Sequence, residues 1–118
     1  GIKILALGAM GELGQYAIDS HQSIGPVIEQ HKIDLLMTYG ELSQHYSHGY
    51  HGKHLHFDDK ESLNKALEKK LIALATEPVV VLAKGSRSTQ MESVVIFIKN
   101  NKKIKGRGSG LFSKTLLL

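Results

Sequence analysis

Short apolar runs alternate along the chain with longer segments in which apolar residues recur at helical spacing. Four strands are predicted, at residues 2–7, 34–39, 53–57 and 79–83. Three helices are predicted between and after them, at residues 16–31, 58–74 and 89–98. Repeated strand–helix alternation favours an α/β fold with a mostly parallel, doubly wound sheet and helices on both faces. Four strands are few for such a sheet.

Two segments depart from this regular pattern. Pro26 lies inside the first predicted helix, so either a kinked helix or two short helices that meet at Gly25-Pro26 are expected. A further short helix is predicted between Glu41 and Ser47. After residue 99 lysine and glycine prevail without a hydrophobic period. We therefore expect one domain at residues 1–99 and a flexible basic Gly/Ser-containing tail at residues 100–118.

Composition narrows the classes of function. Six Lys or Arg and no acid lie between Lys99 and Lys114, whereas residues 1–98 hold 9 basic and 11 acidic residues of a chain whose net charge is +4. The basic excess lacks interleaved aromatic residues, so nucleic-acid binding is not expected. The absence of cysteine excludes disulfides and thiolate chemistry. No apolar run reaches the ~20 residues of a membrane helix and no signal peptide is visible, so we expect a cytoplasmic protein.

The fourth predicted strand leads directly into a short turn that carries two cations and a hydroxyl group. Its valines are followed by Lys84, Gly85, Ser86 and Arg87, and a helix is predicted after them. Ligands of an open parallel sheet collect at the carboxyl ends of its strands, and the start of a helix adds N–H groups and a positive dipole end. This segment is therefore the main candidate for binding a carboxylate or phosphate.

A glycine turn follows the first predicted strand with the spacing G-x-x-G-x-x-G. Its candidate nucleotide-facing residues are Gly8, Met10, Gly11 and Glu12. Glycines here permit a backbone to approach a diphosphate, so a nicotinamide-dependent oxidoreductase is one hypothesis and a plain tight turn is another. The acidic ribose ligand expected ~20 residues further on has no clear occupant. Residues 108–115 approximate a phosphate loop, G-x-x-x-x-G-K-S/T, but neither a predicted strand nor enough following sequence supports one.

Histidines are concentrated in one segment. Five occur within twelve residues, at His45, His48, His51, His54 and His56. Glycines and serines between them suggest a mobile loop, and neither H-E-x-x-H nor a cysteine pair occurs, so no specific metal site is assigned. His21 falls inside the first predicted helix, which favours a core or capping role over catalysis. No catalytic residue is assigned, because no triad or carboxylate pair is recognisable.

An ordered set of motifs resembles a known family. It consists of residues 7–14, His21, residues 33–42, residues 56–60, and the run K-G-S-R-S-x-x-M-E-x-V-V that begins at Lys84. Over about residues 2–98 this set resembles the C-terminal domain of the Mur ligases of bacterial peptidoglycan synthesis, in particular the member that adds D-alanyl-D-alanine to a UDP-muramoyl tripeptide. The resemblance implies a Rossmann-like domain of an ATP- and Mg-dependent amide ligase.

The resemblance also implies partners and a division of labour. The phosphate loop and the UDP-binding site of these ligases lie in central and N-terminal domains, which this chain lacks. The C-terminal domain closes over the reaction centre, where Lys84, Ser86 and Arg87 would contact the incoming dipeptide and the glycine turn would face the nucleotide. We therefore expect a domain that is inactive alone. A free-standing module that binds a nucleotide or small anion is the alternative.

Two departures from the family pattern bear on function. The family usually has G-D-M where this chain has Gly8-Ala9-Met10, so a carboxylate is missing after the first strand. If that carboxylate positions a nucleotide, a magnesium-bound water or the closed-domain interface, we expect the function of this domain to be impaired. The chain also begins at the first strand, without the family's preceding segment. An uncovered edge or face would favour self-association.

Overall fold

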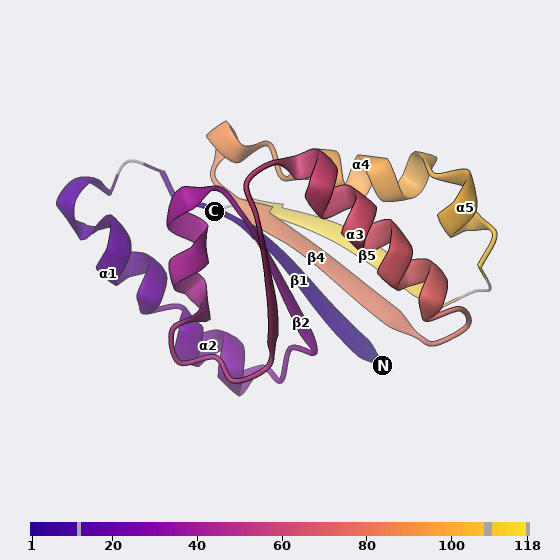
Figure 1. The fold of residues 1–118 in the computed structure, drawn as a ribbon, viewed down its shortest axis with the longest axis horizontal. Coiled ribbons are helices and arrows are strands. Elements are labelled where there is room, and N and C mark those ends of the chain that lie inside the picture. The colour runs from indigo at the N-terminus through magenta and orange to yellow at the C-terminus, as the bar shows by residue number, and fades with distance from the viewer. Residues whose placement is uncertain (12, 108–109, 118) are drawn as a thin grey trace.

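The protein forms one sheet of five parallel strands, all of which end at the same edge (Figure 1). The computed structural model describes residues 1–11, 13–107 and 110–117. The strands are β1 (Ile2–Gly8), β2 (Leu35–Tyr39), β3 (Lys53–Phe57), β4 (Val79–Gly85) and β5 (Leu111–Leu117). Their order across the sheet is β3-β2-β1-β4-β5. The α/β class with a parallel, Rossmann-like sheet is therefore confirmed.

Helices lie on both faces of this sheet. On one face are α3 (Lys60–Ala73), α4 (Glu92–Asn100) and α5 (Lys102–Lys105). On the other are α1 (Ala17–Gln22), α2 (Gly25–Gln30) and the 3-10 segment η2 (Glu41–Ser47), while the shorter 3-10 turns are η1 (Gly14–Tyr16) and η3 (Arg87–Thr89). The central strands are apolar on both sides because each side packs against helices: Ile4 of β1 joins the core under α3 and α4, and Leu7 the core under α2 and η2.

Two expectations about irregular segments are resolved. The first helical region consists of α1 and α2, two short helices that meet before Gly25-Pro26, rather than one kinked helix. Pro26 consequently stands in the first turn of α2, where its missing N–H costs nothing. The segment at residues 41–47 is helical as predicted, in 3-10 form.

The last part of the chain differs from the expected flexible tail. Residues 102–105 form α5, whose start is capped by the Asn101 side chain, and residues 111–117 pair with β4 from Val79 to Gly85. The physical reason is tertiary: β4 offers a row of backbone groups to a parallel neighbour, and Leu111 packs against the core. Residues 108 and 109 of the motif that approximates a phosphate loop lie outside the described residues. The rest of the motif does not fit such a loop, because a strand begins at Leu111 where the loop should continue to a helix.

On the face that carries α1, α2 and η2, helices cover only part of the sheet. A groove of about 450 Å³ runs beside α2 over β1 and β4, and its apolar lining includes Leu5, Ile28 and Leu82. Val80 and Phe112, on β4 and β5, are 37% and 59% exposed on the same face. Among the described residues, no helix covers this apolar part of the sheet.

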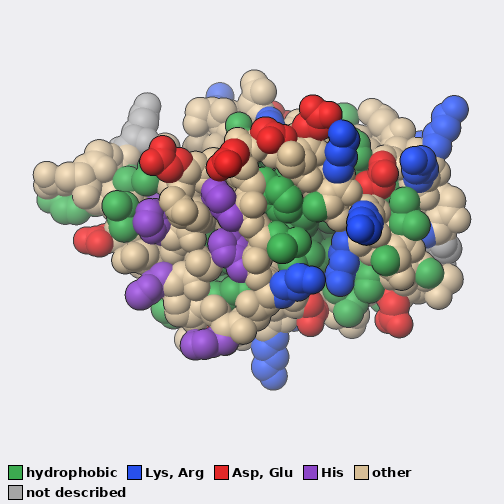
Figure 2. Space-filling model, in the orientation of Figure 1, with side chains coloured by type: hydrophobic (Ala, Val, Ile, Leu, Met, Phe, Trp, Pro, Cys, Tyr) green, Lys and Arg blue, Asp and Glu red, His purple; other side chains and the backbone are tan. Residues whose placement is uncertain are grey.

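Charge and histidine are unevenly distributed over the molecule. On the face shown in Figure 2, histidines gather on the side of η2 and β3, whereas lysine and arginine side chains gather over α3, α4 and α5. Within the described ranges, no helix is long and apolar enough to cross a membrane.

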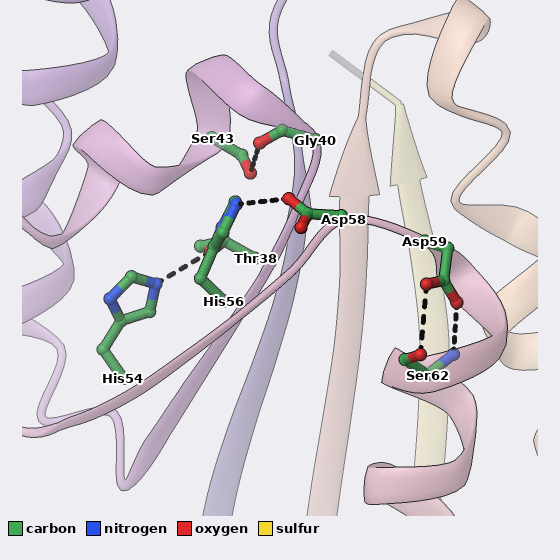
Figure 3. Close-up of polar contacts among 8 residues, drawn as sticks. All are labelled: Thr38, Gly40, Ser43, His54, His56, Asp58, Asp59 and Ser62. Carbon is green, nitrogen blue, oxygen red and sulfur yellow. Dashed lines mark hydrogen bonds and ion pairs between the residues drawn. The ribbon is translucent and has the colours of Figure 1, made fainter.

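The start of α3 is stabilised by a side-chain cap. Asp59 Oδ1 accepts a hydrogen bond from the Ser62 backbone N–H at 2.7 Å, and its Oδ2 accepts one from the Ser62 hydroxyl (Figure 3). These bonds to Ser62 hold the pKa of Asp59 below its ordinary value of 3.8. Because the folded-state pKa is depressed, the stabilisation is present above pH 3.8 and is lost as the pH falls below it.

We expect Asp59→Ala to lower the free energy of unfolding at neutral pH, because it leaves the Ser62 N–H at the start of α3 without its acceptor. The difference from the unmodified protein should disappear as the pH falls well below 3.8. Urea unfolding followed by circular dichroism between pH 2.5 and 7 measures both effects. A constant difference across this range would show that the cap acts through something other than the ionised carboxylate.

Candidate functional site

The two turns singled out in the sequence lie against each other at the carboxyl edge of the sheet. β1 and β4 are neighbours, and Leu7 pairs with Lys84 at their ends. Beyond the strands, the Ser86 backbone N–H donates a hydrogen bond to Ala9 O at 3.2 Å. The glycine turn after β1 and the cationic turn after β4 therefore form one continuous surface.

Glycines permit this close approach. A Cβ atom at Gly85 would lie 2.5 Å from Thr89 Oγ1 and 3.2 Å from the Gly8 Cα. Thr89 is not free to withdraw, because its hydroxyl donates to Ser86 O at 2.6 Å. Gly8 is equally confined, with Thr89 Cβ 2.7 Å from the place of its missing side chain. The strand ends can meet only because both positions lack a side chain.

We expect Gly85→Ala to reduce the free energy of unfolding by about 1–3 kcal/mol, the usual cost of overpacking. The control is Gly11→Ala in the same region, where the new methyl group would be an ordinary 3.5 Å from Ser86 Cβ. Urea denaturation of both variants provides the comparison. Equal midpoints for the two variants would show that the β1 and β4 ends can separate at no cost.

Two buried side chains, one from α1 and one from η2, also hold the backbone of the glycine turn. The Met10 N–H donates to His21 Nε2 at 2.9 Å, and the Tyr46 hydroxyl donates to Gly8 O at 3.0 Å. His21 is fully buried and its ring lies against that of Tyr46, with the ring centroids 4.8 Å apart. Burial raises the pKa of Tyr46 to about 12. The structural role predicted for His21 is thus confirmed, whereas Tyr46 was not anticipated.

The cationic turn presents its polar groups at different depths. Lys84 is half-buried and lines the groove beside α2, whereas Arg87 is exposed in η3. The Ser86 and Ser88 hydroxyl groups lie 2.9 Å apart and share a hydrogen bond. Neither Lys84 nor Arg87 forms an ion pair with a residue in the described part of the chain. Gly11, the second glycine of the glycine turn, is exposed, and Glu12 lies outside the described residues.

Lys60 adds a cation that sequence patterns did not single out. Its Nζ donates to Gln90 O at 3.2 Å and lies 5.7 Å from the centroid of the Tyr39 ring. Gln90 has a positive φ of 47°, an unusual backbone state for a residue other than glycine. Lys60 therefore ties the start of α3 to the end of the cationic turn. In the sequence, a role for Lys60 at this site was indicated only by its place in the family-like motif at residues 56–60.

Two of the five clustered histidines, His54 and His56, converge on the hydroxyl group of the buried Thr38. Thr38 Oγ1 lies 2.8 Å from His54 Nε2 and 2.7 Å from His56 Nδ1, and His56 Nε2 lies 3.7 Å from Asp58 Oδ1 (Figure 3). Burial is the main cause of the lowered pKa of His54, and the charge of the nearby His56 lowers this pKa further. In the part of the chain that the structure describes, no three His, Asp or Glu side chains form a group that could hold a metal ion. These contacts support packing of β3 against β2.

The fold and this edge define a class of protein: a Rossmann-like α/β domain that presents backbone turns and cations at the carboxyl ends of parallel strands, where such domains bind anionic ligands. Comparison with known proteins narrows the class. No protein-family model matches the chain. It is 38% identical over 105 residues to the UDP-N-acetylmuramoyl-tripeptide–D-alanyl-D-alanine ligase of Buchnera aphidicola, and 37% identical over 102 residues to that of Haemophilus influenzae.

The matched regions cover 87% and 83% of this chain but only 22% and 21% of these relatives. A crystal structure of MurF from Acinetobacter baumannii has the same fold, with a TM-score of 0.77 and 24% identity over 86% of this chain and 22% of that one. The chain is therefore homologous to MurF, the UDP-N-acetylmuramoyl-tripeptide–D-alanyl-D-alanine ligase, over a part the size of one domain.

Proposed function

We propose that the chain is the C-terminal domain of an ATP-dependent ligase that joins D-alanyl-D-alanine to a UDP-muramoyl tripeptide in the cytoplasm. The observation that carries this proposal is the hydrogen bond between Ser86 N–H and Ala9 O, because it unites the glycine turn and the cationic turn in one surface. A domain that contacts both the incoming dipeptide and the nucleotide needs such a surface. The homology to MurF supplies the ligands that would lie on it.

Each turn suits a different ligand group. The exposed guanidinium of Arg87 fits the carboxylate of the dipeptide, with Ser86 and Gly85 supplying polar groups beside it. Lys84, half-buried beside α2, adds positive charge at the same end of β4. The backbone at Gly8, Met10 and Gly11, with Glu12 beyond them, is assigned to the nucleotide side. Ala9 adds no carboxylate there, and we expect weaker nucleotide contacts than with aspartate.

The remaining chemistry belongs to other domains. Transfer of a phosphoryl group depends on a phosphate loop and a metal ion that position and neutralise it. Within the described ranges no three acids or histidines form a metal cluster, and residues 111–115 of the loop-like motif lie in β5. We assign the phosphate loop and the Mg²⁺ site to the rest of the ligase, and the chain alone should not catalyse ligation.

The uncovered part of the sheet indicates where the rest of the ligase, or a second copy, would pack. Val80 and Phe112 expose apolar surface beside the groove along α2. Without such a partner, this face is available for self-association. Sedimentation velocity of the chain across a concentration series tests this point.

Titration of the ¹⁵N-labelled chain with D-alanyl-D-alanine and with MgATP tests the proposed function. Saturable shifts are expected at the amides of residues 8–11 and 84–88. Arg87→Ala should weaken the dipeptide response, whereas Lys102→Ala, which removes an exposed cation from α5, should not. A folded spectrum without localised shifts would contradict a preformed site, and turnover by the chain alone would contradict its proposed inactivity.

A free-standing module that binds a nucleotide or small carboxylate is the second candidate. It is favoured by the fact that both turns are hydrogen-bonded to each other within this one chain. Such a module would bind its ligand with full affinity in the absence of any other domain. Tight binding of a single anion, lost in both Lys84→Ala and Arg87→Ala, would favour it, and titration with NAD and NADP tests the less favoured oxidoreductase.

A further inference from the structure

The peptide group between Ala9 and Met10 is fixed at both of its polar atoms. Its oxygen accepts from the Ser86 N–H at 3.2 Å, and its N–H donates to His21 Nε2 at 2.9 Å. One residue earlier, Gly8 O accepts from the Tyr46 hydroxyl. A peptide plane held in this way cannot rotate without breaking a bond to another element of the fold. The direction of the side chain at position 9 is fixed with it.

His21 can hold this peptide in only one protonation form. Because the Met10 N–H donates to Nε2, that nitrogen carries no proton. The proton of the neutral ring is therefore on Nδ1, from which it is donated to Ala17 O within α1. Both ring nitrogens are thus used, and the Tyr46 ring packs against the imidazole. The other tautomer, or the protonated ring, would place an N–H group against the Met10 N–H, and a ring turned by 180° would place a C–H group there.

We propose that His21 is a positioning residue: its neutral, Nδ1-protonated imidazole holds the Ala9–Met10 peptide in the orientation that joins the glycine turn to the cationic turn. It acts through the backbone and does not touch the ligand. His21 is fully buried and lies 11 residues from the peptide that it holds, on a different element. The effect on ligand binding rests on the proposed function above, whereas the effect on the turn does not.

The protonation form can be measured without any substitution. Long-range ¹H–¹⁵N spectra of the histidine rings should show an unprotonated Nε2 and a protonated Nδ1 for His21 at neutral pH. A proton on Nε2 of His21 would overturn the proposal directly, because that nitrogen could not accept from Met10.

Substitutions test the positioning role. His21→Phe removes the acceptor, and amide exchange at Met10 and Ser86 should become about tenfold faster, the factor that a hydrogen bond of ordinary strength supplies. His21→Gln should restore slow exchange, since its amide oxygen reaches the place of Nε2. Leu71→Ala is the control for general destabilisation, because it removes buried contacts on the opposite face of the sheet. It should not change Met10 exchange selectively.

The outcomes separate this proposal from the proposed function. Unchanged Met10 exchange in a folded His21→Phe variant, or no recovery in His21→Gln, would overturn the positioning role. If His21→Phe does not fold, the exchange of His21→Gln and the ring spectra still test the positioning role of His21. If the turn responds as expected but MgATP shifts no amide in either protein, the positioning role stands and the nucleotide-binding function fails. Where binding is seen, His21→Phe should weaken it and His21→Gln should preserve it.

Discussion

A Gly25→Ala variant is expected to be severely destabilised at 25 °C. The added Cβ would overlap the carbonyl oxygen of His48 and lie 2.9 Å from Tyr46 O. Both neighbours are backbone atoms, so no change of side-chain rotamer relieves the overlap. Either α2 or the end of η2 would have to move, which would expose Ile28 and Tyr46 to water. We expect a loss on the order of 4 kcal/mol or more, a large fraction of the 5–15 kcal/mol that stabilises a typical domain.

Gly106→Ala provides the matched control at the other end of the fold. There the new methyl group would come no closer than 3.4 Å to another atom, and the backbone φ of −71° suits any residue. Its free energy of unfolding should stay within about 1 kcal/mol of that of the unmodified protein. Urea unfolding followed by far-ultraviolet circular dichroism compares the two. A cooperative transition for Gly25→Ala at the unmodified midpoint would show that the α2 and η2 contact is not as close as described.

The strands predicted correctly are those with an apolar pattern of their own. β2 is apolar and buried on both faces, residues 79–83 are an apolar run whose alternate positions are buried in β4, and in residues 53–57, which form β3, Leu55 and Phe57 alternate with histidines. β5 has no such apolar pattern: Leu111 and Ser113 face the core side of the sheet, while Phe112 is mostly exposed. Its place is decided by the open side of β4, which no local pattern reports.

The candidate site divides in the same way. That the turns at Gly8 and Ser86 would meet follows from topology, since the ends of neighbouring parallel strands lie at one edge. What holds these turns in place could not be predicted. Tyr46 and Lys60 reach the turns from η2 and α3, and their contacts depend on how distant elements pack. His21 was assigned a structural role from its position in a helix, but its partner, Met10, became visible only in the fold.

Alkaline pH should destabilise the domain through Tyr46. Burial raises the pKa of its phenol from 10.0 to about 12, so the folded state resists losing this proton. A raised folded-state pKa means that the stabilisation is complete below pH 10 and is lost as the pH rises toward 12. The shift corresponds to about 2–3 kcal/mol of the free energy of unfolding. Urea unfolding at intervals between pH 8 and 12 measures this loss.

Tyr46→Phe isolates this contribution from the lysines that titrate in the same range. At pH 8 the variant should be less stable by about 1–3 kcal/mol, because Gly8 O is left without its buried donor. Between pH 10 and 12 its stability should fall less steeply than that of the unmodified protein, so that the difference narrows. Tyr16→Phe is the control, because the Tyr16 side chain is 63% exposed and lies outside the core. Parallel curves for Tyr46→Phe and the unmodified protein would mean that the Tyr46 phenol is accessible to hydroxide in the folded state, and that the glycine turn is held more loosely than its hydrogen bonds indicate.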